Sequence, residues 1–237
     1  YERLVKAAAE HKLLVDYHGC SKPTGLHRTY PNLVNYESVR GNEYNKFSED
    51  GVPPDHNVTI AFTRMTAGPI DYTPGAMRNS TEGNFLTSNE MTMSQGTRAH
   101  QLGMFVVYYA PLQMLCDAPT QYEKYPDILN FLSDVPVTWD ETVPLEGAIG
   151  EYVVVARRKG DDWYVGGLTN WDERNVKIDL SRFAEGSYEA SILEDGINAN
   201  RLATDYQHRT ATVESGDTLE IVMKKGGGFA IHLKAID

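Results

Sequence analysis

The sequence predicts an α/β region followed by an all-β domain, with the change near residue 135. Before that point, short apolar segments alternate with stretches of strong helix formers, which is the order of elements in α/β folds. After it, apolar residues recur with period two between regularly spaced turn clusters. The chain has 237 residues, enough for one large domain or two ordinary ones. We therefore expect residues 1–134 and 135–237 to form two domains.

The first region begins with a helix-forming stretch over 2–12, which leads into a short apolar strand over 13–18 that we expect to be buried. A second short strand is expected over 33–36. Asp55 is a candidate N-cap for the next helix, because an aspartate accepts hydrogen bonds from free backbone N–H groups. The remaining expected elements are helices over 57–65, 95–117 and 125–132, a strand end over 68–75 and a long loop over 76–94.

The second region predicts a β-sandwich of about a hundred residues, because many short strands are separated by regular turns. Trp139, Trp163 and Trp171 lie in this region. Exposed aromatic rings can stack on sugars, but at alternating strand positions they more often belong to the core. Strands are expected over 151–159, 163–170, 175–180, 188–193, 209–213, 218–223 and 229–233.

Strands that end in polar residues, with helices between them, are typical of a (β/α) barrel, whose chemistry lies on the loops after the strands. A complete barrel needs about 250 residues, and residues 1–134 supply about half of that. We expect the C-terminal half of a (β/α)8 barrel followed by an antiparallel β-sandwich. Half a barrel leaves an open sheet edge that needs its missing strands. The first residues, from Tyr1, resemble the middle of a helix, so we expect the chain to be part of a larger protein.

Charge and composition exclude several classes of partner. Lys and Arg number 22 against 33 Asp and Glu, a net charge of −11, which lacks the positive field that attracts nucleic acid. No apolar run approaches the roughly 18 residues of a membrane span. Cys20 and Cys116 are too few for a disulfide framework. We expect them to be unpaired and mostly buried.

A dense polar stretch follows the first expected strand and contains the candidate functional residues. His18 stands at the strand end, and Glu37 and Glu43 lie six residues apart after the second strand. Paired carboxylates perform general acid–base catalysis or hold Ca²⁺. From the residues alone, two such glutamates are more often surface charges than site residues, and His18 is as consistent with a structural histidine as with a functional one.

Four segments resemble glycoside hydrolase family 97, which contains α-glucosidases and α-galactosidases. They are His18-Gly-Cys-Ser-Lys-Pro-Thr-Gly-Leu-His-Arg-Thr-Tyr-Pro-Asn32, Asn35-Tyr-Glu37, Arg40-Gly-Asn-Glu-Tyr44 and Phe62-Thr-Arg-Met-Thr-Ala-Gly-Pro-Ile-Asp-Tyr-Thr-Pro-Gly75. The resemblance covers the whole chain in order. It implies an N-terminal β-sandwich, a (β/α)8 catalytic barrel and a C-terminal β domain, of which this chain would be the second half of the barrel and the last domain.

The resemblance also implies roles for individual residues. Glu43 falls at the position of the general acid, which protonates the departing glycosidic oxygen. Glu37 falls at a Ca²⁺-ligand position, and Glu43 would also lie against that ion. His18 falls where a histidine contacts the sugar in the −1 subsite. Family members come mostly from bacteria that secrete them to the periplasm, so the resemblance implies a periplasmic or secreted protein that acts on oligosaccharides, with Ca²⁺ as cofactor.

Gly19 departs from one branch of the family. The inverting α-glucosidases carry a glutamate directly after this histidine as general base, and a glycine cannot accept a proton. The other branch also lacks that glutamate and uses an aspartate nucleophile on an earlier barrel strand, which retains anomeric configuration. That nucleophile would lie before Tyr1, and the nearby carboxylates that could substitute for it, Asp16 and Asp71, do not match its position.

We therefore expect a retaining exo-α-glycosidase, α-galactosidase-like, that hydrolyses terminal α-linked hexose by double displacement. Its nucleophile is expected upstream of Tyr1, in the missing N-terminal half of the same protein, so the isolated chain should be inactive. Two alternatives remain open. One is an inverting α-glucosidase of the same family, and the other is a carbohydrate-binding protein without catalysis.

Overall fold

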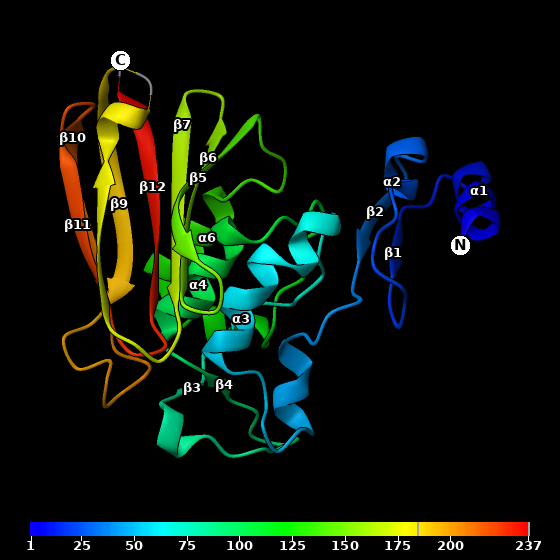
Figure 1. Cartoon of the computed structure of the whole chain (residues 1–237), viewed down its shortest axis with the longest axis horizontal. Coiled ribbons are helices and arrows are strands. Elements are labelled where there is room, and N and C mark those ends of the chain that lie inside the picture. Colours follow the sequence, from blue (N-terminus) through cyan, green and yellow to red (C-terminus); the bar gives the residue numbers. More distant parts are fainter. Residues whose placement is uncertain (184, 237) are drawn as a thin grey trace.

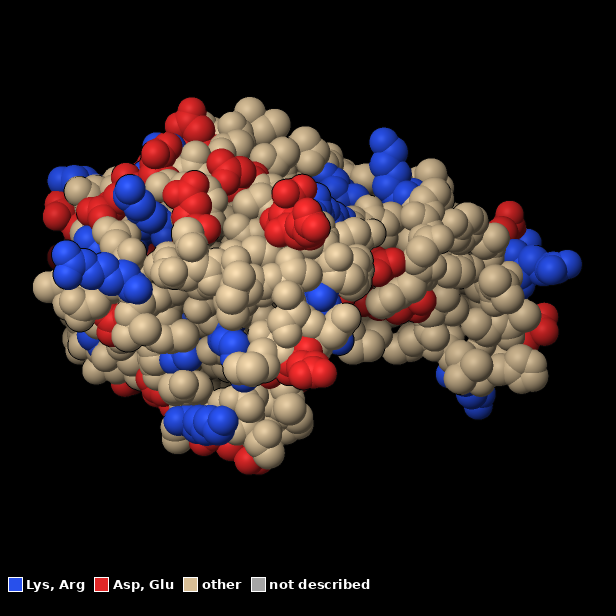
Figure 2. Space-filling model, turned by 90° about the horizontal axis from the view of Figure 1, so that it is seen from below, with Lys and Arg blue, Asp and Glu red and all other residues tan. Residues whose placement is uncertain are grey.

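The computed structural model describes residues 1–183 and 185–236 as a large body with a small N-terminal lobe beside it (Figure 1). The body contains two antiparallel β-sheets, and its helices pack on one face of the larger sheet. The lobe, residues 1–36, holds two helices and a pair of strands. Figure 2 shows that the molecule narrows where lobe and body meet, and that acidic side chains lie at this junction.

The elements follow in this order along the chain. The helices, including the 3₁₀ helices η1–η4, are α1 (Glu2–Glu10), α2 (Leu26–Thr29), η1 (Asn42–Lys46), α3 (Pro54–Phe62), η2 (Arg64–Ala67), η3 (Glu82–Asn84), α4 (Arg98–Val107), α5 (Pro119–Tyr122), α6 (Pro126–Asp134) and η4 (Leu180–Arg182). The strands are β1 (Val15–Tyr17), β2 (Leu33–Tyr36), β3 (Asn79–Ser80), β4 (Ser94–Gln95), β5 (Glu141–Ala148), β6 (Tyr152–Lys159), β7 (Asp162–Thr169), β8 (Arg174–Asp179), β9 (Ser187–Asp195), β10 (Tyr206–Glu214), β11 (Thr218–Met223) and β12 (Gly228–Ile236).

Strands β5 to β12 form a β-sandwich. Six of them make an antiparallel sheet in the order β10-β9-β12-β7-β6-β5, and β8 pairs with β11 in a second sheet. Alternate residues of both sheets point inward, as period two requires. Val176 and Ile221 of the small sheet share one buried cluster with Ile192 and Ile231 of the large sheet. The prediction of an antiparallel sandwich in this part of the chain is confirmed.

Helix α4 closes the other face of the large sheet, and glycines allow its close approach. A Cβ on Gly103 would lie 2.7 Å from the carbonyl oxygen of Gly167 and 2.8 Å from that of Phe229. Every residue of α4 is buried. Its side chains enter two clusters with sheet residues, for example Val106 with Tyr164 and Met104 with Leu168. The helical region before residue 135 is therefore packed tightly on the sandwich.

The N-terminal lobe is small and open by comparison. Strands β1 and β2 run parallel, and Val5 of α1 packs on Leu33 and Tyr36 behind them. Leu13 and Leu14, expected in a buried strand, are 58% and 66% exposed. That expectation was wrong because β1 begins only at Val15 and, among the described residues, pairs with β2 alone. The lobe has the parallel strand order of a barrel, but the barrel itself remains a prediction.

The predicted strands of the sandwich are found within a few residues, but β5 was not predicted. Its sequence contains Pro144 and Gly147, which are depleted in strands. The strand tolerates both because it is an edge strand with a bulge between Pro144 and Glu146. Trp163 is 4% exposed and belongs to the core. Trp139 packs against a second cluster.

Two helix predictions need correction. The helix expected over 95–117 spans only Arg98–Val107, because Thr97 caps its start by accepting a hydrogen bond from the backbone N–H of His100 at 3.1 Å. The chain then becomes extended at Tyr108, and the next residue accepts a hydrogen bond from the backbone of Ile70. Asp55 is not an N-cap, since α3 begins one residue earlier with Pro53 at the cap position.

The long loop expected over 76–94 contains β3, the short 3₁₀ helix η3 and the start of β4. The segment 68–75 forms no strand. Cys20 and Cys116 are free and half-buried. Within the described part of the chain, no helix has the length and apolar character needed to cross a membrane.

Candidate active site

The site lies where the parallel strands β1 and β2 end, at the junction of lobe and body. Parallel strands present their carboxyl ends at the same edge, so His18 after β1 and Glu37 after β2 become neighbours. The backbone N–H of Glu37 donates to the carbonyl of Tyr17 at 2.7 Å, which fixes the two strand ends together. Asp71 joins them because its N–H donates to the carbonyl of Tyr36 at 2.9 Å.

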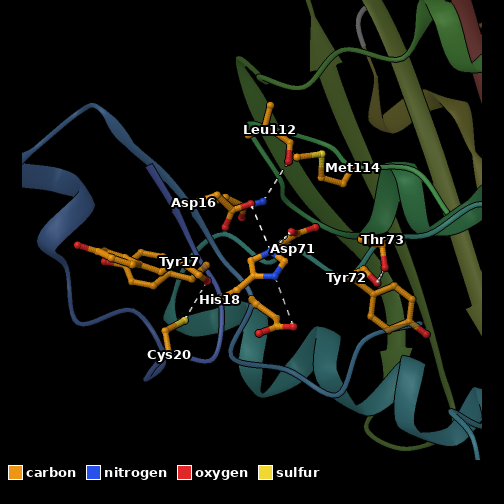
Figure 3. A network of polar contacts seen from close by, with 12 residues as sticks. Asp16, Tyr17, His18, Cys20, Asp71, Tyr72, Thr73, Leu112 and Met114 are labelled. Carbon is orange, nitrogen blue, oxygen red and sulfur yellow. Dashed lines mark hydrogen bonds and ion pairs between the residues drawn. The ribbon is translucent and has the colours of Figure 1, made fainter. Parts of the chain in front are cut away.

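His18 stands among three carboxylates (Figure 3). Its Nε2 lies 2.7 Å from Oδ2 of Asp71 and 3.9 Å from Oδ2 of Asp16, and its Nδ1 lies 3.7 Å from Oε1 of Glu37. The hydrogen bond to Asp71 raises the pKa of His18, although burial opposes this. The imidazole is therefore held as a donor toward Asp71, while its Nδ1 faces the carboxylate of Glu37 beyond hydrogen-bond distance.

Asp16 and Asp71 are buried carboxylates with unused acceptor capacity. Both oxygens of Asp16 and Oδ1 of Asp71 have no hydrogen-bond partner among the described residues. Burial, followed by the charge of Asp71, raises the pKa of Asp16 to about 7. A buried polar group without a partner costs free energy. The arrangement is therefore suited to accept hydrogen bonds from the hydroxyl groups of a ligand or to face a cation.

Glu37 is fixed in place by the residue that follows His18. Its Oε2 accepts a hydrogen bond from the backbone N–H of Gly19 at 2.7 Å. Gly19 has φ +56°, a left-handed conformation that non-glycine residues adopt only rarely. Nothing lies within 4 Å of the position that a Cβ on Gly19 would occupy. The glycine thus leaves open space beside the histidine.

Glu43 lies in η1 and is half-buried. A Cβ on Gly41 would lie 2.6 Å from Oε2 of Glu43, so a side chain at position 41 would displace this carboxylate from its present place. Burial raises the pKa of Glu43, and the negative charges of Glu37 and Asp71 act in the same direction. This environment favours the protonated carboxyl, which is the form that a general acid needs.

A cavity of about 340 Å³ opens beside Glu43, within the range of roughly 300–1,000 Å³ that is usual for small-molecule sites. Its lining combines polar side chains with a larger apolar surface. The lining residues are Asn42, Glu43, Asn45, Lys46, Thr73, Ala76, Thr92, Met93, Ser94, Leu115, Cys116 and Asp117. A polar ligand can therefore reach the Glu43 carboxyl from the body side.

Arg64 organises the loops of the site, although nothing in the sequence singles it out beyond its place in the fourth segment, Phe62 to Gly75. Its guanidinium is buried and donates to the carbonyls of Tyr36, Glu37 and Pro69 at 3.1, 3.3 and 2.8 Å. Ser38, next to Glu37, has φ +29° and also accepts from Arg64. Such strained residues gather at functional sites, where the surrounding structure holds them in place.

The structure brings His18, Glu37 and Glu43 into one region, as the spacing of the motifs predicts. The partnership of Asp71 with His18 was missed, because the two residues lie 53 positions apart. The potential metal-binding atoms that lie within 4.8 Å of one another belong to Asp16, His18 and Asp71. Glu37 adjoins this group through His18.

Glycoside hydrolases use a pair of carboxyl groups for acid–base catalysis. The site has such a pair, because the pKa of the Glu43 carboxyl is raised, Glu37 supplies a second carboxylate and a cavity of ligand size opens beside Glu43. Comparison with known families agrees with this class. The model described as "Glycoside hydrolase 97" matches residues 1–39, and the model described as "Glycosyl-hydrolase 97 C-terminal, oligomerisation" matches residues 138–234. The chain belongs to glycoside hydrolase family 97.

Curated relatives and solved structures support this membership. The chain is 44% identical over 233 residues to a retaining α-galactosidase of Bacteroides thetaiotaomicron, covering 98% of this chain and 35% of the relative. It is 31% identical over 230 residues to a probable retaining α-galactosidase of Streptomyces bingchenggensis, covering 97% and 33%. A family 97 enzyme from Pseudoalteromonas sp. strain K8, solved with acarbose, has a TM-score of 0.91 and 39% identity, covering 99% and 37%. The chain thus spans about a third of the length of these relatives.

Proposed function

We propose that the protein is a retaining exo-α-glycosidase of α-galactosidase type, which hydrolyses terminal α-linked hexose by double displacement. The observation that carries this proposal is Glu43, a half-buried carboxyl of raised pKa that opens to a cavity and faces the charge of Glu37. The name of the 44% identical relative, a retaining α-galactosidase, supports the same stereochemical outcome.

In this mechanism Glu43 works twice. Its protonated carboxyl donates the proton to the glycosidic oxygen, and the C–O bond breaks as a covalent glycosyl-enzyme forms. The ionised Glu43 then takes a proton from water, which attacks the anomeric carbon and releases the sugar with its configuration retained. The raised pKa favours the first step, because the carboxyl keeps its proton at higher pH than a free glutamate does.

The covalent nucleophile is proposed to come from a carboxylate in the two-thirds of the relatives' length that this chain does not span. We assign residues 1–134 to the second half of a (β/α)8 barrel and residues 135–237 to the C-terminal β-sandwich. The parallel pair β1–β2, with site residues at its carboxyl end, supports the barrel. Gly19 supports retention, since it offers no base beside His18 and its φ of +56° disfavours any side chain there.

Asp71 is proposed to fix the orientation of His18 for contact with the sugar. It holds Nε2 of the imidazole at 2.7 Å and is 2% exposed, so the ring has one orientation. Asp16, whose oxygens have no hydrogen-bond partner among the described residues, lies with Asp71 on the Nε2 side of the ring, and Nδ1 faces Glu37. Hydroxyl groups of a hexose would satisfy these atoms, which explains why the site tolerates buried carboxylates without partners.

Calcium fits the chemistry of this site. Ca²⁺ prefers hard carboxylate oxygens, and its charge would offset the repulsion among Glu37, Glu43 and Asp71 that raises the pKa of Glu43. We propose that Glu37 and Glu43 each contribute a ligand oxygen. When bound, the ion would supply electrostatic stabilisation beside the departing oxygen. Binding of Tb³⁺ as a luminescent Ca²⁺ analogue tests this without an activity assay, because Glu37→Gln should weaken it, whereas the exposed Glu49→Gln should not.

The partners and location that we propose follow from the family. The substrate class is an oligosaccharide with a terminal α-linked hexose, in keeping with the solved relative that holds acarbose. A periplasmic or secreted location is proposed because family members act on oligosaccharides taken up from outside the cell.

The test uses the intact parent protein with Ca²⁺ and an aryl α-galactoside. Glu43→Gln should lower kcat/KM by about 10²- to 10⁴-fold for a poor phenol leaving group and much less for dinitrophenol, which needs no proton. The matched control is Glu49→Gln, an exposed neighbour, which should behave like the wild type. Near-normal turnover by Glu43→Gln with both leaving groups would remove Glu43 from the mechanism.

Proton NMR of the first-formed sugar decides the stereochemistry. The α-anomer appearing first would support double displacement. The β-anomer first would establish inversion and overturn the retaining assignment. Turnover of an α-glucoside with none of the galactoside would keep the reaction class and change the sugar.

A further inference from the structure

Tyr72 follows Asp71 on a loop of the site, and its ring points away from His18 into the body (Figure 3). The residue is 1% exposed. Its backbone carbonyl accepts a hydrogen bond at 3.0 Å from the N–H of Asn42, which directly precedes Glu43. Its neighbour Asp71 holds the imidazole of His18 at 2.7 Å. Tyr72 therefore links the segment that carries the Glu43 carboxyl to the carboxylate that orients the histidine.

The side chain of Tyr72 begins a series of buried hydrogen bonds that ends in the sandwich. Its hydroxyl donates to Oδ1 of Asn57 in α3 at 2.6 Å. Nδ2 of Asn57 lies 3.2 Å from Nε2 of His100 in α4, and Nδ1 of His100 lies 2.8 Å from the carbonyl oxygen of Gly227. Gly227 belongs to the turn that precedes β12. These four residues, which we call the anchor, connect a loop of the site to a turn of the sandwich.

The donors and acceptors of the anchor permit one direction of hydrogen bonding. Burial lowers the pKa of His100 to about 4, so near pH 7 the ring is neutral and offers one donor and one acceptor. The carbonyl of Gly227 can only accept, so Nδ1 donates to it and Nε2 accepts from the amide of Asn57. Oδ1 of Asn57 is then the acceptor for the Tyr72 hydroxyl. A buried network that is fully paired in this way holds one geometry.

The residue after Tyr72 is held in a conformation that needs such support. Thr73 has φ +57°, a left-handed conformation that β-branched residues rarely adopt, and it lines the cavity beside Glu43. Its carbonyl accepts a hydrogen bond from Nδ2 of Asn42 at 3.2 Å. Conformations of this kind persist only where the surrounding structure fixes them, and they gather at functional sites. The buried ring of Tyr72 and the amide of Asn42 fix this one from two sides.

We propose that Tyr72 is a positioning residue for the reaction, and that the sandwich holds it in place through Asn57 and His100. This inference rests on the proposed role of Glu43 as general acid. The anchored loop sets the place of the Glu43 carboxyl, so the sandwich contributes to proton donation although none of its residues touches the substrate. Misplacement of a reacting group by about 1 Å can cost about 10²-fold in rate. A small shift of this loop is therefore measurable.

The first test is Tyr72→Phe in the intact parent protein with Ca²⁺, because this variant loses the hydroxyl and keeps the ring. We expect kcat/KM to fall about 10-fold for a phenyl α-galactoside and less than about 2-fold for the dinitrophenyl analogue, since only the phenol needs a proton from Glu43. A smaller folded fraction would lower both values alike. The ratio of the two values thus separates positioning from a loss of stability.

Tyr108→Phe is the matched control. Tyr108 is 2% exposed, its ring lies 5.1 Å from that of Tyr72, and its hydroxyl donates to the backbone carbonyl of Asn57 at 2.8 Å. The control therefore removes a buried hydrogen bond of the same kind from the same helix but leaves the anchor intact. It should keep the ratio of the wild type.

His100→Asn breaks the anchor two bonds away from the site loop. The asparagine amide replaces Nδ1 of the ring and leaves nothing at the place of Nε2, so the bond to Asn57 is lost. The ratio should shift in the same direction as in Tyr72→Phe. The double variant should shift no further than the larger single variant, because both substitutions break one network. Shifts that add would indicate two independent effects and would overturn the proposal.

Hydrogen–deuterium exchange provides a second readout that needs no substrate. The N–H of Asn42 is bonded to the carbonyl of Tyr72, so a loosened loop should expose the amides of 42–46. We expect faster exchange there in Tyr72→Phe and in His100→Asn, and the wild-type rate in Tyr108→Phe.

The two readouts distinguish failure of this proposal from failure of the proposed function. If Glu43→Gln shows no dependence on the leaving group, Glu43 is not the acid, and faster exchange in Tyr72→Phe would still support the anchor. Wild-type exchange in Tyr72→Phe would overturn the anchor whatever Glu43 does. Faster exchange with an unchanged ratio, in a protein whose Glu43→Gln variant does depend on the leaving group, would overturn the positioning role.

Discussion

The N-terminal lobe and the sandwich body differ in how completely their apolar side chains are buried and their buried polar groups are hydrogen-bonded. In the lobe, Leu13 and Leu14 are more than half exposed, and Asp16 is buried without a hydrogen-bond partner. In the body, α4 is entirely buried against the large sheet, and buried His100 has partners for both ring nitrogens. The sandwich and its covering helix are therefore the most tightly packed part of the chain, whereas the residues proposed for chemistry lie in the lobe and at its junction with the body.

This division follows from what a reactive carboxylate requires. Repulsion among several carboxylates that are held close together lowers the free energy of unfolding, so other parts of the fold must offset this loss. The fully packed sandwich and its covering helix supply the offset. Substitutions in the sandwich and α4 should thus act mainly on stability, and substitutions in the lobe and at its junction with the body mainly on binding and catalysis.

The largest effect is expected at the contact between α4 and the sheet. Gly103→Val places a branched side chain against the carbonyl oxygens of Gly167 and Phe229, which would lie 2.7 and 2.8 Å from the new Cβ. Because neither backbone can move without breaking sheet or helix, we expect a loss of about 3 kcal/mol or more in the free energy of unfolding. Chemical denaturation followed by circular dichroism measures the change.

Gly216→Ala is the matched control for this substitution, since nothing lies within 4 Å of its Cβ position. It should shift the free energy of unfolding by no more than about 0.5 kcal/mol. Equal effects of the two substitutions would show that the helix–sheet contact does not limit stability, and the contrast between body and lobe would fail.

A pH dependence of stability is expected from His100. Complete burial lowers its pKa to about 4 from the ordinary 6.5, with the hydrogen bond to Gly227 opposing the shift. The folded state therefore prefers the neutral ring, and its stabilising contribution is complete above pH 6.5. As the pH falls toward 4, the unfolded state gains a proton that the folded state resists, and on the order of 3 kcal/mol is lost.

Urea denaturation at pH 7.5 and pH 4.5 tests this expectation. His100→Asn should be less stable at pH 7.5, because it leaves a cavity, but its stability should decline less between the two pH values than that of the wild type. Parallel declines in both proteins would assign the acid sensitivity to other groups.

The smallest effect is expected in the lobe, where a substitution should raise the free energy of unfolding rather than lower it. The pKa of the Asp16 carboxyl is raised to about 7, so at pH 8 this group is ionised next to Asp71, which destabilises the folded state. Asp16→Asn removes this charge. We expect a gain of about 1 kcal/mol in the free energy of unfolding at pH 8, together with weaker binding of hexose. Isothermal titration with galactose and thermal denaturation measure the two effects. A variant that loses stability and binds galactose normally would contradict the assignment of Asp16 to the site.

Local patterns predicted most of the sandwich because period two is visible wherever one strand face is buried. They failed at β5, where Pro144 and Gly147 mask a strand that only its edge position permits. Helix α4 was predicted too long, because the bond between Ile70 and Tyr109 that extends the chain after it is a tertiary contact.

The candidate site was predictable as far as its residues lie on contiguous motifs. His18, Glu37 and Glu43 follow strand ends and carry the chemistry that paired carboxylates imply. The role of Asp71 was not predictable, because its bond to His18 depends on how a loop 53 residues away returns to β2. Arg64 was missed for a related reason, since its partners are backbone carbonyls that leave no pattern in the sequence.

The close approach of α4 to the sheet also bears on how such proteins can be recombined during evolution. A segment cut at residue 138 would leave behind the helix that covers Leu168 and Ala230. The turn at Gly226 and Gly227 would lose its bonds to Thr97 and His100 as well. The sandwich and the helix that precedes it therefore form one packing unit, and a chimaera that respects this unit should keep α4 with the strands.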